Sequence, residues 1–575
     1  MNRRDLRFLA VIAVALTAAG CVAFQADLDT TVTVGSAEPI PTAPSSTTST
    51  LPARDCSPIL AGAGPGTSRI GPLGPTEASI SISRAVFPCA DEVVVTAGND
   101  LGLVAVSAQL AAALGGPLLV AGEGDQASLA AELERLAPRK VTLVGEVPPV
   151  ALPPDAGLEA LEGTLQEVAK LAYAAMGADI WVGIDSGGVP AIGRILQPIS
   201  TGQSFWVPAS GTVEACDRGD EQITAAINRR AEAVQPAGDL WLVDACSPEL
   251  ALVAAVAARS AGGTVLLVDG RDLRTNRALV AAVPGSSVPE HVFLLGDIAP
   301  DVDWQVDALV GGLELPGGGL TLFPGRRIVA LYGNPTTAAL GVMGEQGPEE
   351  AVLRAREVAA PYGADGTEVL PAFEIIATVA SASATEDGDY SWEMPVDELR
   401  PWVDAAAREG LYVTLDLQPG RTDFLTQAKR FEELLVLPHV GLALDSEWRL
   451  KPNQVHLRQI GSVDAVEVNE VVDWLASLVR EHALPQKLLI VHQFKFSMIT
   501  NRELIKSPPE LAVMIHVDGQ GPIHSKYDTY GALTGAADAD RWWWGWKNFY
   551  DEDTPTPTPA QVLELDPLPV YVSYQ

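Results

Sequence analysis

Short apolar segments alternate with longer amphipathic segments along most of the chain, and this alternation predicts strands joined by helices. From residue 92 onward the apolar segments EVVVTAG, PLLVAG and KVTLVGEV are separated by LVAVSAQLAAALGG and by DQASLAAELERLAP. Near-continuous apolar runs of this length are typical of strands buried on both faces, and the segments between them have helical periodicity. This part of the chain is therefore predicted to form α/β units with parallel sheets.

The same order of segments returns later in the chain. DLWLVDACSPELALVAAVAARSAGG, TVLLVDG, NRALVAAVPG and HVFLLGDI repeat it, with Leu240 at the position that corresponds to Val93. The interval between the two copies leaves room for a third, and ADIWVGI, VPAIGRILQ and SFWVPAS form a degenerate one. Internal repetition of this kind predicts stacked βαβ modules, which we assign to residues 56–310.

A second pattern follows a Gly/Pro-rich segment at residues 311–325, which is predicted to be a linker. Residues 326–575 have the length of a (β/α)8 barrel, about 250 residues, and their alternation predicts a TIM-like barrel with one extra strand at the C-terminal end. The fold class is therefore α/β, with repeated modules followed by a barrel. The predicted barrel strands are 327–333, 368–379, 411–417, 439–448, 463–468, 487–494, 511–519 and 542–549.

The N-terminal residues are typical of an export signal. Residues 1–20 carry arginines before an apolar run that is too short to span a bilayer. The run ends at Ala-Ala-Gly-Cys21, which resembles a bacterial lipobox. The resemblance implies a lipoprotein anchored through Cys21 at the extracytoplasmic face of the membrane; the alternative is an ordinary signal peptide with an incidental cysteine. Residues 21–55 are rich in Ser, Thr and Pro, which predicts an extended tether.

Net charge argues against one class of function, and the cysteine content favours an exported protein with disulfides. The formal net charge of −35 argues against nucleic-acid binding, because that function requires Lys and Arg to neutralise phosphates. The even number of cysteines after Cys21 predicts disulfides in an exported chain. Four cysteines permit three connectivities, of which nearest-neighbour pairing keeps each bridge local: Cys56–Cys89 and Cys216–Cys246. No CxxC motif is present, which argues against a zinc or redox site.

Residues 82–310 resemble the bacterial cell-wall-binding repeat 2 family. The resemblance is carried by the order of a strand, an Ala-rich helix, a PLLV strand, a second helix and a KVTLVGE strand. It implies three stacked α/β modules that dock onto anionic polymers of the cell wall.

Polar residues fall at the ends of the predicted barrel strands. A charged residue in an apolar strand is costly unless it is paired or faces a cleft, and parallel barrels keep their chemistry at the carboxyl ends of the strands. We therefore predict a polar site there. The alternative for Asp416 and Asp518 is that each only forms a turn, because a glycine follows each within four residues. The predicted substrate-binding residues are Tyr332, Asn334, Trp448, Gln493, Asp518, Trp546 and Lys547.

The segment LALDSEW resembles the strand-four D-x-E motif of chitinase-like and lysozyme-like glycosidase barrels. The resemblance implies that Glu447 is the general acid and Asp445 its partner. Further acids of the chitinase motif are missing, which leaves Glu374 or Asp416 as the second carboxylate. Trp448 and the tryptophans of residues 542–546 either stack on sugar rings or pack in the core.

Together these features predict a hydrolase directed at a cell-wall or extracellular glycan. The alternative from another class is an envelope scaffold that binds glycan or protein without turnover. A metal-dependent hydrolase using His492, His516 and Asp518 is a lesser alternative, because HxH, HxxxH and HExxH motifs are absent. The sequence therefore predicts neither a metal site nor a cofactor.

Overall fold

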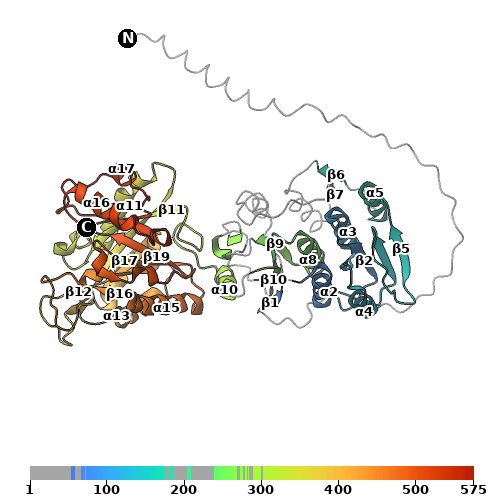
Figure 1. Cartoon of the computed structure of the whole chain (residues 1–575), viewed down its shortest axis with the longest axis horizontal. Coiled ribbons are helices and arrows are strands. Elements are labelled where there is room, and N and C mark those ends of the chain that lie inside the picture. The colour runs from blue at the N-terminus through green and yellow to red at the C-terminus, as the bar shows by residue number, and fades with distance from the viewer. Residues whose placement is uncertain are drawn as a thin grey trace, which may run out of the picture. The chain divides into compact units, whose positions relative to one another are not determined.

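The computed structural model describes the C-terminal half of the chain continuously and the N-terminal half in part (Figure 1). The predicted export signal, Cys21 and most of the predicted tether lie outside the described residues and stay predictions. No helix among the described residues is long and apolar enough to cross a membrane. The described ranges are 54–58, 66–71, 73–176, 181–185, 204–208, 238–268, 272–275, 279–280, 283, 289, 291–298 and 302–575.

The first α/β unit is a four-stranded parallel sheet in the order β3-β2-β4-β5. Its central helix begins at Asp100, whose carboxylate accepts the amide hydrogens of Gly102 and Leu103, and ends at Gly115 in the left-handed conformation. These caps satisfy backbone groups that the helix itself leaves unpaired. The elements are β2 (Glu92–Ala97), α3 (Leu101–Leu114), β3 (Leu118–Ala121), α4 (Gln126–Leu136), β4 (Lys140–Val144), β5 (Gly157–Leu161) and α5 (Leu165–Met176).

The predicted repeat appears as a second four-stranded parallel sheet, in the order β1-β10-β8-β9. Strand β8 lies between β9 and β10 just as β2 lies between β3 and β4, so the repeated modules are confirmed. The middle copy is described only as the parallel pair β6 and β7. The elements are β1 (Gly66–Ile70), β6 (Trp181–Asp185), β7 (Ser204–Pro208), β8 (Leu240–Asp244), α8 (Pro248–Ala261), β9 (Thr264–Val268), β10 (His291–Leu295) and α10 (Asp303–Gly311).

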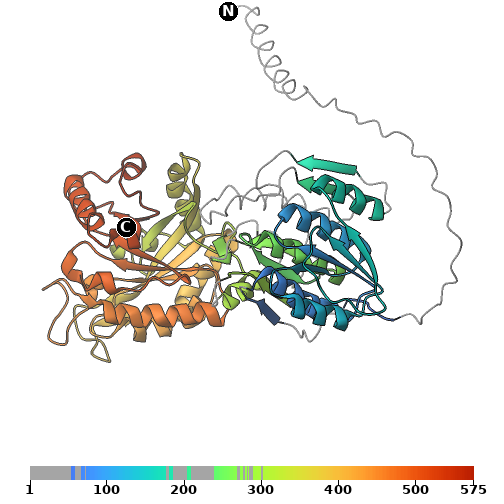
Figure 2. The ribbon, with the colours of Figure 1, turned by 45° about the vertical axis from the view of Figure 1, so that its right-hand side comes forward.

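Apolar helices join the modules into one core. Helix α3 packs against α8, and both contribute to a hydrophobic cluster that also contains α2 (Pro75–Val86) (Figure 2). The predicted Cys56–Cys89 disulfide is present and ties the chain before β1 to the end of the α2 region. Cys216 lies outside the described residues, so its pairing with Cys246 stays a prediction.

Residues from 326 onward form the predicted barrel, with eight parallel strands in the order β11-β21-β20-β19-β17-β15-β14-β12. Pairing between β11 and β12 closes it, and the short strand β13 (Ser391–Glu393) adds antiparallel to β12. The barrel strands are β11 (Arg326–Gly333), β12 (Glu368–Ala380), β14 (Tyr412–Leu417), β15 (Val440–Leu444), β17 (Lys487–His492), β19 (Leu511–Val517), β20 (Trp543–Asn548) and β21 (Tyr571–Tyr574).

Two predicted strands have other roles than expected. The segment 463–468 is not a barrel strand, because only Val463 and Asp464 are extended, as β16, which pairs with β18 (Ile499–Thr500). The Asp464 carboxylate then accepts the amide hydrogen of Val466 and starts helix α15 (Ala465–Glu481). The predicted extra strand at the C-terminal end is β21, which takes the vacant barrel position between β20 and β11.

Helices follow most barrel strands and cover the outside of the barrel. Their apolar faces and the outward residues of the strands form one continuous hydrophobic core. They are α11 (Pro348–Ala359), α12 (Val396–Glu409), α13 (Phe424–Arg430), α14 (Glu432–Leu435), α15, α16 (Ile523–Thr534) and α17 (Pro559–Val562).

The inside of the barrel is apolar toward the amino ends of its strands. Leu488, Met514 and Tyr412 fill this region, and Leu322 and Phe323 from the Gly/Pro-rich segment pack against it. Gly441 is required on β15, because a Cβ there would lie 2.7 Å from the Leu488 carbonyl oxygen and 2.8 Å from the Tyr412 hydroxyl. The apolar layer leaves only the carboxyl half of the interior for polar side chains.

Candidate active site at the barrel mouth

Polar side chains line the inside of the barrel toward the carboxyl ends of its strands. Because alternate residues of a strand point inward, Tyr332 and Glu374, which are paired in register, share this layer with the paired His492 and His516. Each residue of the group is at most 7% exposed. We call the group the mouth cluster: Tyr332, Glu374, Asp416, Asp445, His492, His516, Asp518 and Lys547.

His492 is the centre of the mouth cluster. Its Nε2 lies 3.0 Å from Glu374 Oε1 and its Nδ1 lies 3.0 Å from Asp518 Oδ2. Burial opposes a charge on the ring, but the nearby Asp416, Asp518 and Glu374 carboxylates outweigh it and raise the pKa of His492 well above its ordinary value. The ring therefore bridges two carboxylates that would otherwise repel each other in a buried site.

Glu374 uses both of its carboxylate oxygens. Oε1 faces His492, and Oε2 accepts a hydrogen bond of 3.1 Å from the Tyr571 hydroxyl. Burial alone would raise the pKa of Glu374, but the hydrogen bond from His492 and the neighbouring positive charges lower it to about 2. Glu374 is therefore held as a buried carboxylate.

Asp416 is held from one side only. Its Oδ2 accepts a 2.7 Å hydrogen bond from the Tyr332 hydroxyl, whereas its Oδ1 is buried without a hydrogen-bond partner within the described part of the chain. Burial is the main reason that the pKa of Asp416 rises to about 6. The ammonium group of Lys547 lies over the Tyr332 ring, with its Nζ 3.3 Å from the ring centroid.

The two carboxylates of the D-x-E motif lie in different places: Asp445 is inside the barrel, and Glu447 is at its edge. Asp445 follows β15 and is 2% exposed, and its Oδ1 accepts the amide hydrogen of Glu447 at the start of the 3₁₀ turn Ser446–Trp448. The turn places Glu447 in a half-buried position. Burial, followed by the charge of Asp518, raises the pKa of Glu447 to about 7. Glu447 is thus a carboxyl group that can hold a proton near neutral pH and still meet solvent.

His516 depends on a glycine in the tryptophan-rich segment. A Cβ on Gly545 would lie 2.4 Å from His516 Cδ2, so only glycine leaves room for the ring. His516 Nε2 lies 3.3 Å from the Ser573 hydroxyl, and Nδ1 is buried without a hydrogen-bond partner among the described residues. Burial lowers the pKa of His516 to about 3, so the ring is neutral.

Four residues predicted to bind substrate have other contacts. The Asn334 amide donates to the Ile376 carbonyl at 3.0 Å. Gln493 accepts a 2.7 Å hydrogen bond from Arg502. Trp546 lies on the outward face of β20 against Tyr527 and Tyr530 of α16, and the half-buried Trp448 contacts the ring of His456. Their roles in glycan binding stay predictions.

Two residues of β21 take part in the site without having been predicted. Tyr571 contacts Glu374, and Ser573 contacts His516. Their spacing of two residues in the segment YVSY places both on the inner face of the strand. The alternation of the segment indicates that Tyr571 and Ser573 share one face of a strand. It does not show that this face lines the barrel, because that depends on β21 pairing with β20 and β11.

Comparison with known proteins gives no family assignment. No family model and no curated protein matches the sequence. Among solved structures, Cwp8 from Clostridium difficile is 13% identical with a TM-score of 0.34, covering 42% of this chain and 51% of Cwp8. Cwp6 from the same organism is 13% identical with a TM-score of 0.33, covering 61% of this chain and 63% of Cwp6.

The third solved structure has a lower TM-score. Xanthomonas albilineans dihydropteroate synthase is 13% identical with a TM-score of 0.19, covering 43% of this chain and 87% of that protein. The chain thus spans about half of Cwp8 and 63% of Cwp6. At these TM-scores the likenesses assign neither a fold nor a function to this chain.

Proposed function

We propose that the barrel hydrolyses a glycosidic bond of a cell-wall or extracellular glycan, with Glu447 as the proton donor. The observation that carries the proposal is the position of Glu447, a half-buried carboxyl group in the turn that follows barrel strand β15, beside a buried set of carboxylates. Its pKa of about 7 keeps it protonated in slightly acidic to neutral solution. A general acid of a glycosidase needs this combination of access and a raised pKa.

Asp416 is better suited than Glu374 to be the second carboxylate. Glu374 already has both oxygens in hydrogen bonds, whereas Asp416 Oδ1 has no hydrogen-bond partner within the described residues and lies 3.8 Å from His492 Nε2. Glu447 gives its proton to the glycosidic oxygen as the bond from C1 to that oxygen breaks. Depending on its separation from Glu447, the Asp416 carboxylate either takes a proton from the water that attacks C1 or bonds C1 itself. In the second case water then hydrolyses the bond from C1 to Asp416, with Glu447 taking the proton of that water.

The proposed location is the cell envelope. The export signal and the lipobox-like Cys21 support lipid anchoring at the extracytoplasmic face of the membrane. The Cys56–Cys89 disulfide supports an oxidising compartment, because disulfides persist mainly in exported proteins. In this arrangement the repeated modules present the barrel to cell-wall material.

The test is to incubate the full chain with purified cell wall and a panel of glycans and to assay new reducing ends. We expect release by the wild type and a loss of roughly 100-fold or more in Glu447→Gln, because that variant cannot donate the proton. Glu481→Gln, which changes an exposed carboxylate on α15, is the matched control and is expected to match the wild type. If the wild type and Glu447→Gln are equally silent but are retained on wall material, the barrel is a binding scaffold.

A further inference from the structure

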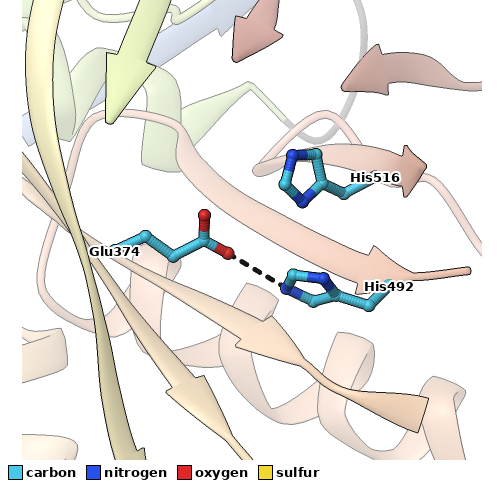
Figure 3. A group of neighbouring side chains, drawn as sticks. All are labelled: Glu374, His492 and His516. Atoms are coloured by element: carbon cyan, nitrogen blue, oxygen red, sulfur yellow. Dashed lines mark hydrogen bonds and ion pairs between the residues drawn. The ribbon is translucent and has the colours of Figure 1, made fainter. Parts of the chain in front are cut away.

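Three side chains of the mouth cluster converge from different strands at one buried point. Glu374 on β12, His492 on β17 and His516 on β19 each offer one possible ligand atom, and these atoms lie within 4.8 Å of one another (Figure 3). All three side chains are 0% exposed. A metal ion bound at about 2.0–2.2 Å from each ligand needs ligand atoms about 3–4 Å apart, so the ligands are almost in place.

The group also has the outer contacts of a metal site. Metal-bound histidines usually give their second ring nitrogen to a carboxylate or another fixed oxygen. His492 Nδ1 faces Asp518 at 3.0 Å, and His516 Nε2 faces Ser573 at 3.3 Å. The Tyr571 hydroxyl holds the second oxygen of Glu374. Each ligand is therefore fixed on the side away from the point of convergence.

A second observation points to a missing occupant. His516 Nδ1 is buried and has no hydrogen-bond partner in the described part of the chain. Because Ser573 occupies the other ring nitrogen, Nδ1 is the atom left to face Glu374 and His492. A buried polar atom without a hydrogen bond is unfavourable, because it has lost its hydrogen bonds to water. Asp416 Oδ1 also lacks a hydrogen-bond partner among the described residues, and it lies 3.8 Å from His492 Nε2.

We propose that Glu374, His492 and His516 bind a divalent transition-metal ion of the zinc type. Two imidazoles and one carboxylate form a common zinc ligand set, with a fourth position open to water or to a further oxygen. Mg²⁺ and Ca²⁺ do not fit, because they prefer ligand sets made of oxygen. On binding, His492 releases its Nε2 proton to solvent, and the contact between Nε2 and Glu374 is replaced by coordination of both groups to the ion. The metal site goes beyond the proposed glycan hydrolysis and does not depend on it.

The test is the metal content of the purified full chain. After incubation with equimolar Zn²⁺ and desalting, elemental analysis is expected to find about one zinc per chain in the wild type. Glu374→Gln and His516→Gln are expected to retain less than about a tenth of that amount. Ser573→Ala, which keeps all three ligands, is expected to bind zinc about 10-fold more weakly. His439→Gln changes a buried histidine whose ring contacts the Val403 carbonyl, and it is expected to bind like the wild type.

Bound metal and glycan turnover are separate readouts, so failure of either proposal is recognised by itself. No zinc in the wild type, or zinc that remains in both ligand variants, overturns the metal site. If the variants do not fold, X-ray absorption of the zinc-loaded wild type decides. A first shell of two imidazoles with one or two oxygens supports the site, and any other shell overturns it.

Discussion

Glu447 has a raised pKa, which links its protonation to the stability of the barrel. Burial and the charges of Asp518 and Asp416 raise the pKa, while Lys547 and His492 act against this effect. The pKa is about 7 in the folded protein against an ordinary value of 4.5. Between these two pH values the folded state binds more protons than the unfolded state. The stabilising contribution of the protonated group is therefore complete below pH 4.5 and is lost as the pH rises to about 7.

Replacing Glu447 with glutamine removes this dependence on pH. We expect Glu447→Gln to gain stability relative to the wild type between pH 4.5 and pH 8. The gain is on the order of 1 kcal/mol, because solvent screening of the half-buried group reduces the value that the full pKa shift would give. Urea unfolding followed by tryptophan fluorescence at several pH values, with EDTA present, measures the difference. Glu481→Gln is expected to show no such trend. A difference that is constant with pH, or that falls as the pH rises, contradicts the environment described for Glu447.

At the scale of the elements, the C-terminal strand β21 is the closing piece of the barrel. It pairs with β20 on one side and with β11 on the other, so its four residues satisfy the backbone of two strands. It also supplies Tyr571 and Ser573 to the mouth cluster. Without β21 both neighbours would have an unpaired edge, which is a template for association with other chains.

Deletion of residues 570–575 is therefore expected to prevent the barrel from closing. We expect the near-ultraviolet circular dichroism of the buried tryptophans to be lost and the protein to associate, as measured by light scattering. Tyr574→Phe is the matched control, because it removes only the hydroxyl contact with Tyr362 and keeps the strand. A truncated chain that stays monomeric with an unchanged spectrum would show that β21 is dispensable.

The order of strands and helices could be predicted from the sequence because hydrophobic periodicity is a local property. The prediction of a barrel strand at 463–468 is wrong, because the short alternation there resembles a strand while Asp464 begins a helix whose apolar positions continue to Val479. The sequence predicts a strand at Tyr571–Tyr574. Its place in the barrel cannot be predicted locally, because it depends on which two strands lack a neighbour once the others have paired.

The site could be predicted only in part, because sequence periodicity is local whereas pairing between strands is not. The inward positions of Glu374 and Asp445 follow from the alternation of residues along β12 and along the extension of β15. The convergence of Glu374, His492 and His516 depends on the register across several strands, because no two of these residues are neighbours in the sequence. Motifs such as HxH report ligands on one element and cannot detect this arrangement.

At the scale of the whole molecule, negative charge is the dominant property. The chain has 73 Asp and Glu residues against 38 Lys and Arg residues, a formal net charge of −35. An excess of this size repels anionic polymers over a distance set by the salt concentration, about 10 Å at 0.1 M. If the modules bind an anionic polymer of the wall, the contact must form against this repulsion.

Retention on intact cell wall is therefore expected to increase as the salt concentration rises. Between 0.05 and 0.3 M salt the screening length falls by about 60%, which weakens the repulsion while short-range contacts persist. The measurement is the fraction of the full chain that sediments with purified walls at each salt concentration. Walls stripped of their anionic polymers are the control, and retention on them is expected to be independent of salt. Retention on intact walls that falls with added salt would instead require a local basic surface that attracts the polymer, because like charges cannot produce that sign.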